Sequence, residues 1–158
     1  MNRRALCATL IFAFLFQTLI VLLLIPTVEA QNLPWFEIVN VVTRKDDGTP
    51  SSTFKRGEFV FVEVTVKRTD GAYYYYTEES FLLIVRAAMG SPPTLWGLGA
   101  FRGSLAVNDE MTAAPAFQIP TNAPTGTMEI TVYVWSDWAA YGGVPLATPY
   151  TVTITVTD

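Results

Sequence analysis

The chain contains no histidine, and its single cysteine is Cys7. The absence of histidine excludes a Ser-His-Asp triad, a Cys-His pair, a histidine-ligated zinc and a haem held by a proximal histidine. One cysteine cannot form an intrachain disulfide, so a chain of 158 residues must rely on packing for its stability. Ten basic residues stand against fourteen acidic ones, for a net charge of −4. This balance argues against a nucleic-acid partner.

Sequence motifs of catalysis are also missing. There is no G-x-S-x-G elbow, no phosphate-binding loop, no G-x-G-x-x-G and no metal-spaced set of cysteines and histidines. Acidic pairs occur at Asp46-Asp47, Glu78-Glu79 and Asp109-Glu110. Neighbouring residues of a strand point to opposite faces, so no such pair alone can flank a glycosidic bond. We therefore expect a protein that is not an enzyme and that uses no cofactor.

The first thirty residues have the pattern of a targeting segment. Arg3 and Arg4 precede an apolar stretch, residues 5–25, and the small residues Val28 and Ala30 stand where a signal peptidase would select them. This predicts a secretory signal peptide, residues 1–30, followed by an extracytoplasmic domain, residues 31–158. The apolar stretch is also about long enough to span a bilayer, so a retained membrane anchor remains an alternative.

What the chain does have is the composition of an all-β domain, rich in valine, threonine and tyrosine. Glu58 to Arg68 alternates, with four valines on one face, and Met128 to Trp135 alternates in the same way. The expected strands are Trp35–Arg44, Glu58–Arg68, Tyr73–Tyr76, Phe81–Ala88, Thr94–Val107, Ala116–Ile119, Met128–Trp135 and Tyr150–Val156. About seven to eight short strands separated by turn residues predict a single β-sandwich. Three glycines in Thr94–Val107 predict bulges or an irregular edge there. Lys45–Gly57 has the composition of a loop.

Two motifs carry a resemblance to a family. Residues 117–133 read FQIPTNAPTGTMEITVY, and residues 54–58 read FKRGE before the valine-rich strand. They resemble immunoglobulin-like domains of secreted and cell-surface proteins of bacteria and archaea. The resemblance implies an immunoglobulin-like β-sandwich outside the cell, and it implies no site residues. The N-terminal Arg4-Ala5-Leu6 is also similar to the cleavage site of archaeal pilin signal peptides, which leaves a pilin-like subunit with a retained apolar helix as an alternative.

Two groups of hydrophobic residues are candidates for recognition. Exposed aromatic rings can stack on sugars or anchor a protein interface, and the candidates are Trp135, Trp138, Tyr141, Tyr74 and Tyr76. The alternative is a purely structural role, in which these rings cover the ends of the sandwich. Loop carboxylates at Asp46, Asp47 and Asp70 could hold a calcium ion, although solvated loop acids are the simpler interpretation.

The second group is the first expected strand, which is apolar on both faces. Its apolar residues are Trp35, Phe36, Ile38, Val39, Val41 and Val42. A strand of this kind needs cover on both faces. It either lies within its own sandwich or adds to the sheet of a neighbouring copy, as in donor-strand exchange.

The sequence thus predicts a non-enzymatic surface protein, acting in adhesion or as a structural subunit of an extracellular filament or envelope. Its expected partners are other copies of itself or other surface proteins, and it would contact a membrane only through its N-terminal segment. A carbohydrate-binding module that uses the aromatic residues near Trp138 is the main alternative.

Overall fold

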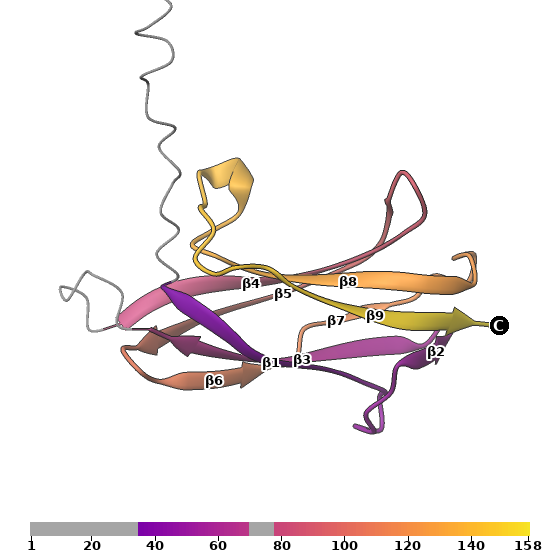
Figure 1. The fold of residues 1–158 in the computed structure, drawn as a ribbon, viewed down its shortest axis with the longest axis horizontal. Coiled ribbons are helices and arrows are strands. Elements are labelled where there is room, and N and C mark those ends of the chain that lie inside the picture. The colour runs from indigo at the N-terminus through magenta and orange to yellow at the C-terminus, as the bar shows by residue number, and fades with distance from the viewer. Residues whose placement is uncertain (1–34, 70–77) are drawn as a thin grey trace, which may run out of the picture. The chain divides into compact units, whose positions relative to one another are not determined.

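The computed structural model describes residues 35–69 and 78–158, which form nine strands and one short 3-10 helix (Figure 1). The strands are β1 (Phe36–Arg44), β2 (Thr53–Lys55), β3 (Phe59–Arg68), β4 (Glu78–Met89), β5 (Thr94–Ala106), β6 (Glu110–Ala113), β7 (Ala116–Gln118), β8 (Gly126–Trp135) and β9 (Tyr150–Thr157). The helix η1 (Ala139–Tyr141) lies between β8 and β9. The prediction of an all-β fold is confirmed. The N-terminal segment 1–30 and the expected strand Tyr73–Tyr76 lie outside the described residues.

The strands form two sheets. The first has the order β1-β3-β6, with β7 also paired to β3, and the second has the order β2-β9-β8-β4-β5. All pairs are antiparallel except β2 with β9, which is parallel. The chain changes sheet after β1, β2, β3, β5 and β7, whereas β4–β5, β6–β7 and β8–β9 are consecutive strands of one sheet. Each sheet needs the other to cover its apolar face.

One hydrophobic core joins the two sheets. The four alternating valines of β3 are all buried at 0–1% exposure, and Met128, Ile130, Val132 and Val134 of β8 are at 0%. Between the sheets, the rings of Phe36 and Phe81 lie 5.2 Å apart, centroid to centroid. The two alternating patterns in the sequence therefore assigned the inward faces of β3 and β8 correctly.

The expected irregularity of the fifth strand is confirmed, and its cause is tertiary. Strand β5 is an edge of the second sheet, and its register against β4 shifts between Ala87 and Ala88. β7 passes close to this edge: a Cβ on Gly97 would lie 2.2 Å from the Phe117 ring, and one on Gly99 would lie 2.9 Å from the Ala116 carbonyl oxygen. Two of the three glycines let β7 approach the edge of β5.

Three sequence-based boundaries were wrong. The expected loop Lys45–Gly57 contains β2, whose Phe54 is fully buried, and β6 begins at Glu110, in a segment for which no strand was expected. Strand β4 begins at Glu78, ahead of the expected start at Phe81. Strands of three or four residues are too short to show a two-residue period, and pairing with β9 and β3 defines β2 and β6 instead.

Candidate functional site

The aromatic candidates near the end of β8 lie on a projecting loop, residues 136–144. Its base is a continuation of the β8 hairpin: Ser136 N–H donates to the Val144 carbonyl at 2.9 Å, and Leu146 N–H donates to the Val134 carbonyl at 2.8 Å. Trp135 forms an isolated bridge with Pro145. The loop projects beyond the second sheet in Figure 1, with η1 at its tip.

Polar contacts hold this loop in one conformation. Asp137 accepts hydrogen bonds from the Trp138 N–H at 2.8 Å and from the Arg102 guanidinium at 2.5 Å. The Trp138 N–H, and then Arg102, lower the pKa of the Asp137 carboxyl below its usual value. Gly143 passes so close to Asp137 that a Cβ there would lie 1.9 Å from the Asp137 carbonyl oxygen. The loop is therefore anchored to β5 and tightly folded.

The three aromatic residues of this region differ in accessibility. Trp135 and Trp138 are half-buried, whereas Tyr141 at the end of η1 is 79% exposed. Val144 on the same loop is also exposed. The other two aromatic candidates, Tyr74 and Tyr76, lie outside the described residues. The structure thus leaves Tyr141 as the ring most accessible to a ligand.

A second apolar surface, which the sequence did not suggest, lies on the outer face of the second sheet. Leu98 of β5 is 50% exposed and stands opposite Arg86 of β4. In the next outward-facing row, Ile84 of β4 lies between Ala100 of β5 and Tyr133 of β8. These cross-strand neighbours can be identified only when the register of β4, β5 and β8 is known.

The candidate assembly strand lies in its own sheet. β1 pairs with β3, and Phe36 is fully buried, while Trp35, Ile38 and Val41 pack against the core. A register shift between Ile38 and Asn40 leaves Val39 as an extra, exposed residue. This bulge, which alternation cannot reveal, reverses the facing of the residues that follow it, including Val42.

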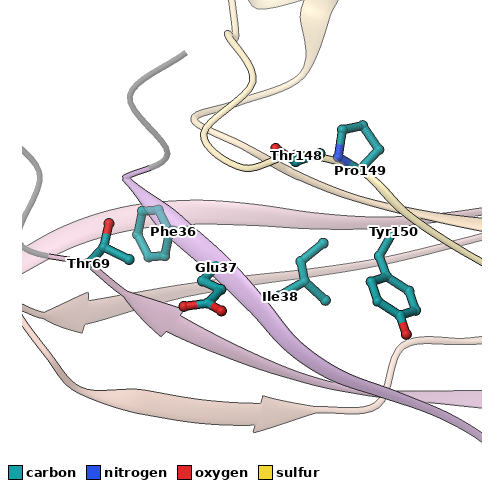
Figure 2. Close-up of a pocket in the computed structure, with 7 residues that line it drawn as sticks. All are labelled: Phe36, Glu37, Ile38, Thr69, Thr148, Pro149 and Tyr150. Atoms are coloured by element: carbon teal, nitrogen blue, oxygen red, sulfur yellow. The ribbon is translucent and has the colours of Figure 1, made fainter. Parts of the chain in front are cut away.

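A groove separates the starts of β1 and β9, with a volume of about 270 Å³ (Figure 2). Its lining residues are Phe36, Glu37, Ile38, Thr69, Thr148, Pro149 and Tyr150. In Figure 2 the side chains of Ile38 and Tyr150 lie on its two sides. Glu37 is the single charged residue of this lining. The groove is therefore mostly apolar, and it is bordered by β1, an edge strand of the first sheet, and by β9 of the second sheet.

The edge of β9 that faces this groove is only partly paired. β2 pairs with Thr155–Thr157, at the end of β9, and the Thr155 N–H donates to the Ser52 carbonyl at 2.8 Å. Within residues 35–69 and 78–158, no strand pairs with Tyr150–Ile154 on this side. Five residues of an eight-residue strand thus present an open edge.

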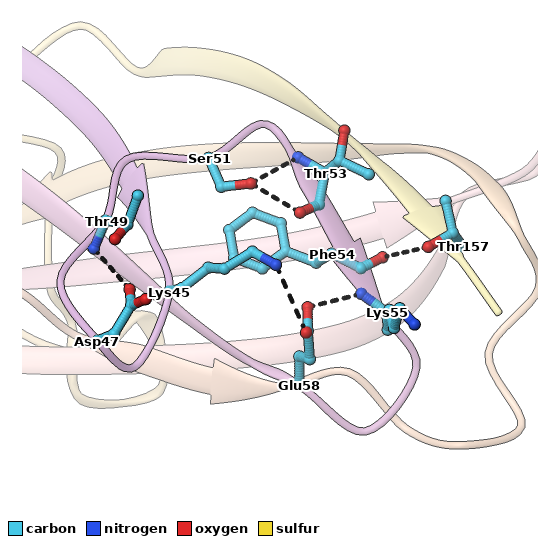
Figure 3. A network of polar contacts seen from close by, with 9 residues as sticks. All are labelled: Lys45, Asp47, Thr49, Ser51, Thr53, Phe54, Lys55, Glu58 and Thr157. Carbon is cyan, nitrogen blue, oxygen red and sulfur yellow. Dashed lines mark hydrogen bonds and ion pairs between the residues drawn. The ribbon is translucent and has the colours of Figure 1, made fainter.

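Polar contacts hold the connection between β1 and β2 (Figure 3). Glu58 accepts the Lys55 N–H at 2.7 Å and pairs with the Lys45 ammonium at 3.5 Å, and the pKa of Glu58 is lowered mainly by the Lys55 hydrogen bond. Asp47 accepts the Thr49 N–H at 2.8 Å, which lowers its pKa. The same segment crosses between the sheets: the Ser51 N–H donates to the Thr43 carbonyl of β1, and the next residue, Ser52, accepts the Thr155 N–H of β9.

Several of the described acidic residues make structural contacts. Besides Asp47 and Glu58, Glu78 accepts a hydrogen bond from the Ser104 hydroxyl at 2.8 Å, and Glu110 pairs with Lys67 at 3.7 Å. No group of three or more acidic, histidine or cysteine side chains lies close enough to hold a metal in the described part of the chain. Asp70, the third residue of the calcium hypothesis, lies outside it.

Comparison with known proteins adds no relative. No family model matches the chain, and no curated protein matches it significantly. Among the described residues there is no helix that is long and apolar enough to cross a membrane. The interpretation of function therefore depends on the geometry of the loop, the groove and the open edge.

Proposed function

We propose that the chain is a secreted or cell-surface protein with an immunoglobulin-like sandwich, which acts in adhesion or as a structural subunit and assembles through its sheet edges. The observation that carries this proposal is the open, uncharged edge of β9 beside an apolar groove. Strand edges with free backbone groups bind other strands, and this kind of recognition needs no catalytic residues.

The order of the strands supports the immunoglobulin-like part of the proposal. Immunoglobulin-like sandwiches place their first, second, fourth and fifth strands in one sheet and their third, sixth and seventh in the other. Here β1, β3 and β6 share one sheet, and β4, β8 and β9 share the other in the order β9-β8-β4. β5 extends the second sheet beyond β4. β2 then corresponds to a short continuation of the first strand that has crossed to the opposite sheet.

Exchange of β1 between copies remains a form of the same proposal. β1 lies at the edge of its sheet and contacts one neighbouring strand, β3. The same pairing could be made by β1 of a second copy, since the residues that receive Phe36 would be identical. Exchange would need the connection between β1 and β2, residues 45–52, to act as the hinge that spans the distance to the neighbouring copy.

Assembly is tested with the product that cells release from the full-length gene. We expect its intact mass to correspond to a chain that starts at Gln31, and we expect beads coated with it to cluster, because each bead presents many weak edge contacts. Beads coated with the heat-unfolded chain are the control. Negative-stain images of native surface material show whether the contacts extend into filaments.

Other outcomes of this experiment separate the alternatives. A chain that starts near Leu6 would support the pilin-like subunit, and a chain that retains Met1 would support the membrane anchor. Coated beads that stay dispersed, together with native material that contains only isolated chains, would contradict assembly through sheet edges.

A second candidate function is carbohydrate binding by the aromatic loop. The observation that favours it is the 79% exposure of Tyr141 on a loop that Asp137 and Gly143 hold in shape. An exposed ring on a rigid support can stack on a sugar with little loss of conformational entropy.

Replacement of the exposed ring tests this second function. We expect Tyr141→Ala, and also Trp138→Ala, to reduce retention on a polysaccharide column about tenfold or more, because each removes part of the stacking surface. The thermal melt should change little for Tyr141→Ala, since its side chain contributes little to the core. Val144→Ala, an exposed apolar truncation on the same loop, serves as the control. Unchanged retention of both aromatic variants would exclude the loop as a sugar platform.

A further inference from the structure

We propose that two copies of this chain pair β9 against β9 in antiparallel orientation, about a two-fold axis at Val152. The inference rests on the proposed function and deepens it, since it names the edge and the partner: the open edge Tyr150–Ile154 and the same edge of a second copy. Such a pair would join the two second sheets into one continuous sheet.

The direction of the backbone groups on β9 follows from its known hydrogen bonds. In an antiparallel sheet, successive residues direct their N–H and C=O groups alternately to the two neighbouring strands. The Thr155 N–H points away from β8, because it donates to the Ser52 carbonyl. The β8–β9 register is continuous from Tyr150 to Val156, so Thr153 and Thr151 also direct their groups to the open side.

These groups are self-complementary in one register. With Val152 opposite its own copy, Thr151 of one chain faces Thr153 of the other, and each such pair exchanges two hydrogen bonds. The outward N–H and C=O groups of Thr151 and Thr153 are then hydrogen-bonded in both copies. The two copies are equivalent, as a two-fold interface requires.

The neighbouring registers satisfy fewer groups. A pair centred on Thr151 would place Pro149 opposite Thr153, and proline has no N–H to donate. A pair centred on Thr153 would place Thr151 opposite Thr155, whose N–H already binds Ser52. The Val152-centred register is therefore favoured by the residues at both ends of the open edge.

The open edge also lacks the devices that protect edge strands from pairing. Such strands usually carry a charge, a proline or a bulge. β9 contains none of these from Tyr150 to Thr157. By contrast, the β1 edge has the bulge at Val39 and the charge of Glu37, and β5 has a register shift and Arg102. β9 is thus the long edge best suited to accept a strand.

Side chains on both faces favour the same pairing. On the outer face, Thr151 and Thr153 of each copy are exposed and would form a row of four threonines, a favourable cross-strand combination. On the inner face, Val152 is half-buried, and Tyr150 is 43% exposed beside the groove. In the proposed register Tyr150 stands opposite Ile154 of the other copy.

A cysteine placed on the two-fold axis tests the register. The Val152 pair would be a non-hydrogen-bonded pair with Cα atoms about 4.5 Å apart, which is within the range of a disulfide. The test uses the full-length gene product in a Cys7→Ser background, because Cys7 is the only natural cysteine. We expect Val152→Cys to become mainly a disulfide-linked dimer under mild oxidation. Thr151→Cys is the register control, since it would face Thr153 and stay monomeric on a reducing-agent-free gel.

A charge on the edge tests the pairing without cysteine chemistry. We expect Thr153→Lys to weaken self-association in sedimentation about tenfold or more, because two ammonium groups and their hydration shells would lie at the interface. Thr127→Lys is the matched control: Thr127 is also an exposed threonine of the second sheet, but it lies on the interior strand β8. Its association should equal that of the unsubstituted chain.

The outcomes distinguish this inference from the proposed function. Copies that associate, but without a Val152→Cys disulfide and with no effect of Thr153→Lys, would overturn β9 pairing and leave assembly through another edge standing. A disulfide from Thr151→Cys, with none from Val152→Cys, would overturn the register. A chain that sediments as a monomer up to about 100 µM would overturn the inference, and dispersed beads in the clustering experiment would then remove the proposed function as well.

Discussion

Phe36→Ala is expected to lower the free energy of unfolding by about 3–5 kcal/mol, the usual cost of truncating a buried phenylalanine to alanine. The side chain is at 0% exposure and contacts the Phe81 ring of the opposite sheet. Its removal would leave a cavity at the point where β1 joins the core, beside the groove. Chemical denaturation followed by tryptophan fluorescence measures the change.

The control for this substitution is on the same strand. Val39→Ala removes an exposed side chain at the bulge and should change the free energy of unfolding by about 0.5 kcal/mol or less. The measurement also bears on strand exchange. If β1 stays in its own sheet, the effect of Phe36→Ala is the same at low and high protein concentration. An effect that grows on dilution would indicate that β1 is exchanged between copies.

Gly97→Ala is expected to destabilise the protein by about 1–3 kcal/mol. This is a large effect for the addition of one methyl group, and nothing in the sequence around Gly97 indicates it. A Cβ at this position would lie 2.2–2.7 Å from atoms of the Phe117 ring. Phe117 is buried, and the atoms approached, Cγ, Cδ2 and Cε2, include the root of the ring rather than its far end alone, so the whole ring must shift from its place in the core. Thermal and chemical unfolding would both report the loss.

The opposite face of β5 provides the comparison. Ala100→Val adds a larger group on the exposed outer face of the same strand, and we expect almost no change in stability. A second variant, Gly97→Ala with Phe117→Ala, should cost less than the sum of the two single substitutions, because alanine lacks the ring atoms that the Cβ meets. Equal stability of Gly97→Ala and the unsubstituted chain would show that β7 does not pack on β5 as described.

Only part of the candidate sites could be predicted from the sequence. The aromatic residues near the end of β8 could be identified, because tryptophan and tyrosine beside glycine and proline mark a loop that can present rings. The exposure of these rings could not be predicted, and Tyr141 is far more exposed than Trp135 or Trp138. The open edge of β9 left no trace in the sequence, since Tyr150–Val156 has the same alternating pattern whether or not a neighbour pairs with it.

The sequence by itself determined the all-β class, the long strands and the inward faces of β3 and β8. Alternation with a period of two is a local property, and it directly reflects which face of a strand is buried. The tertiary structure alone decided the short strands β2 and β6, the bulge at Val39, the reason for Gly97 and the incomplete cover of β9. Each of these depends on which distant segment lies alongside, and a backbone edge becomes open or closed only when the chain has chosen its neighbours.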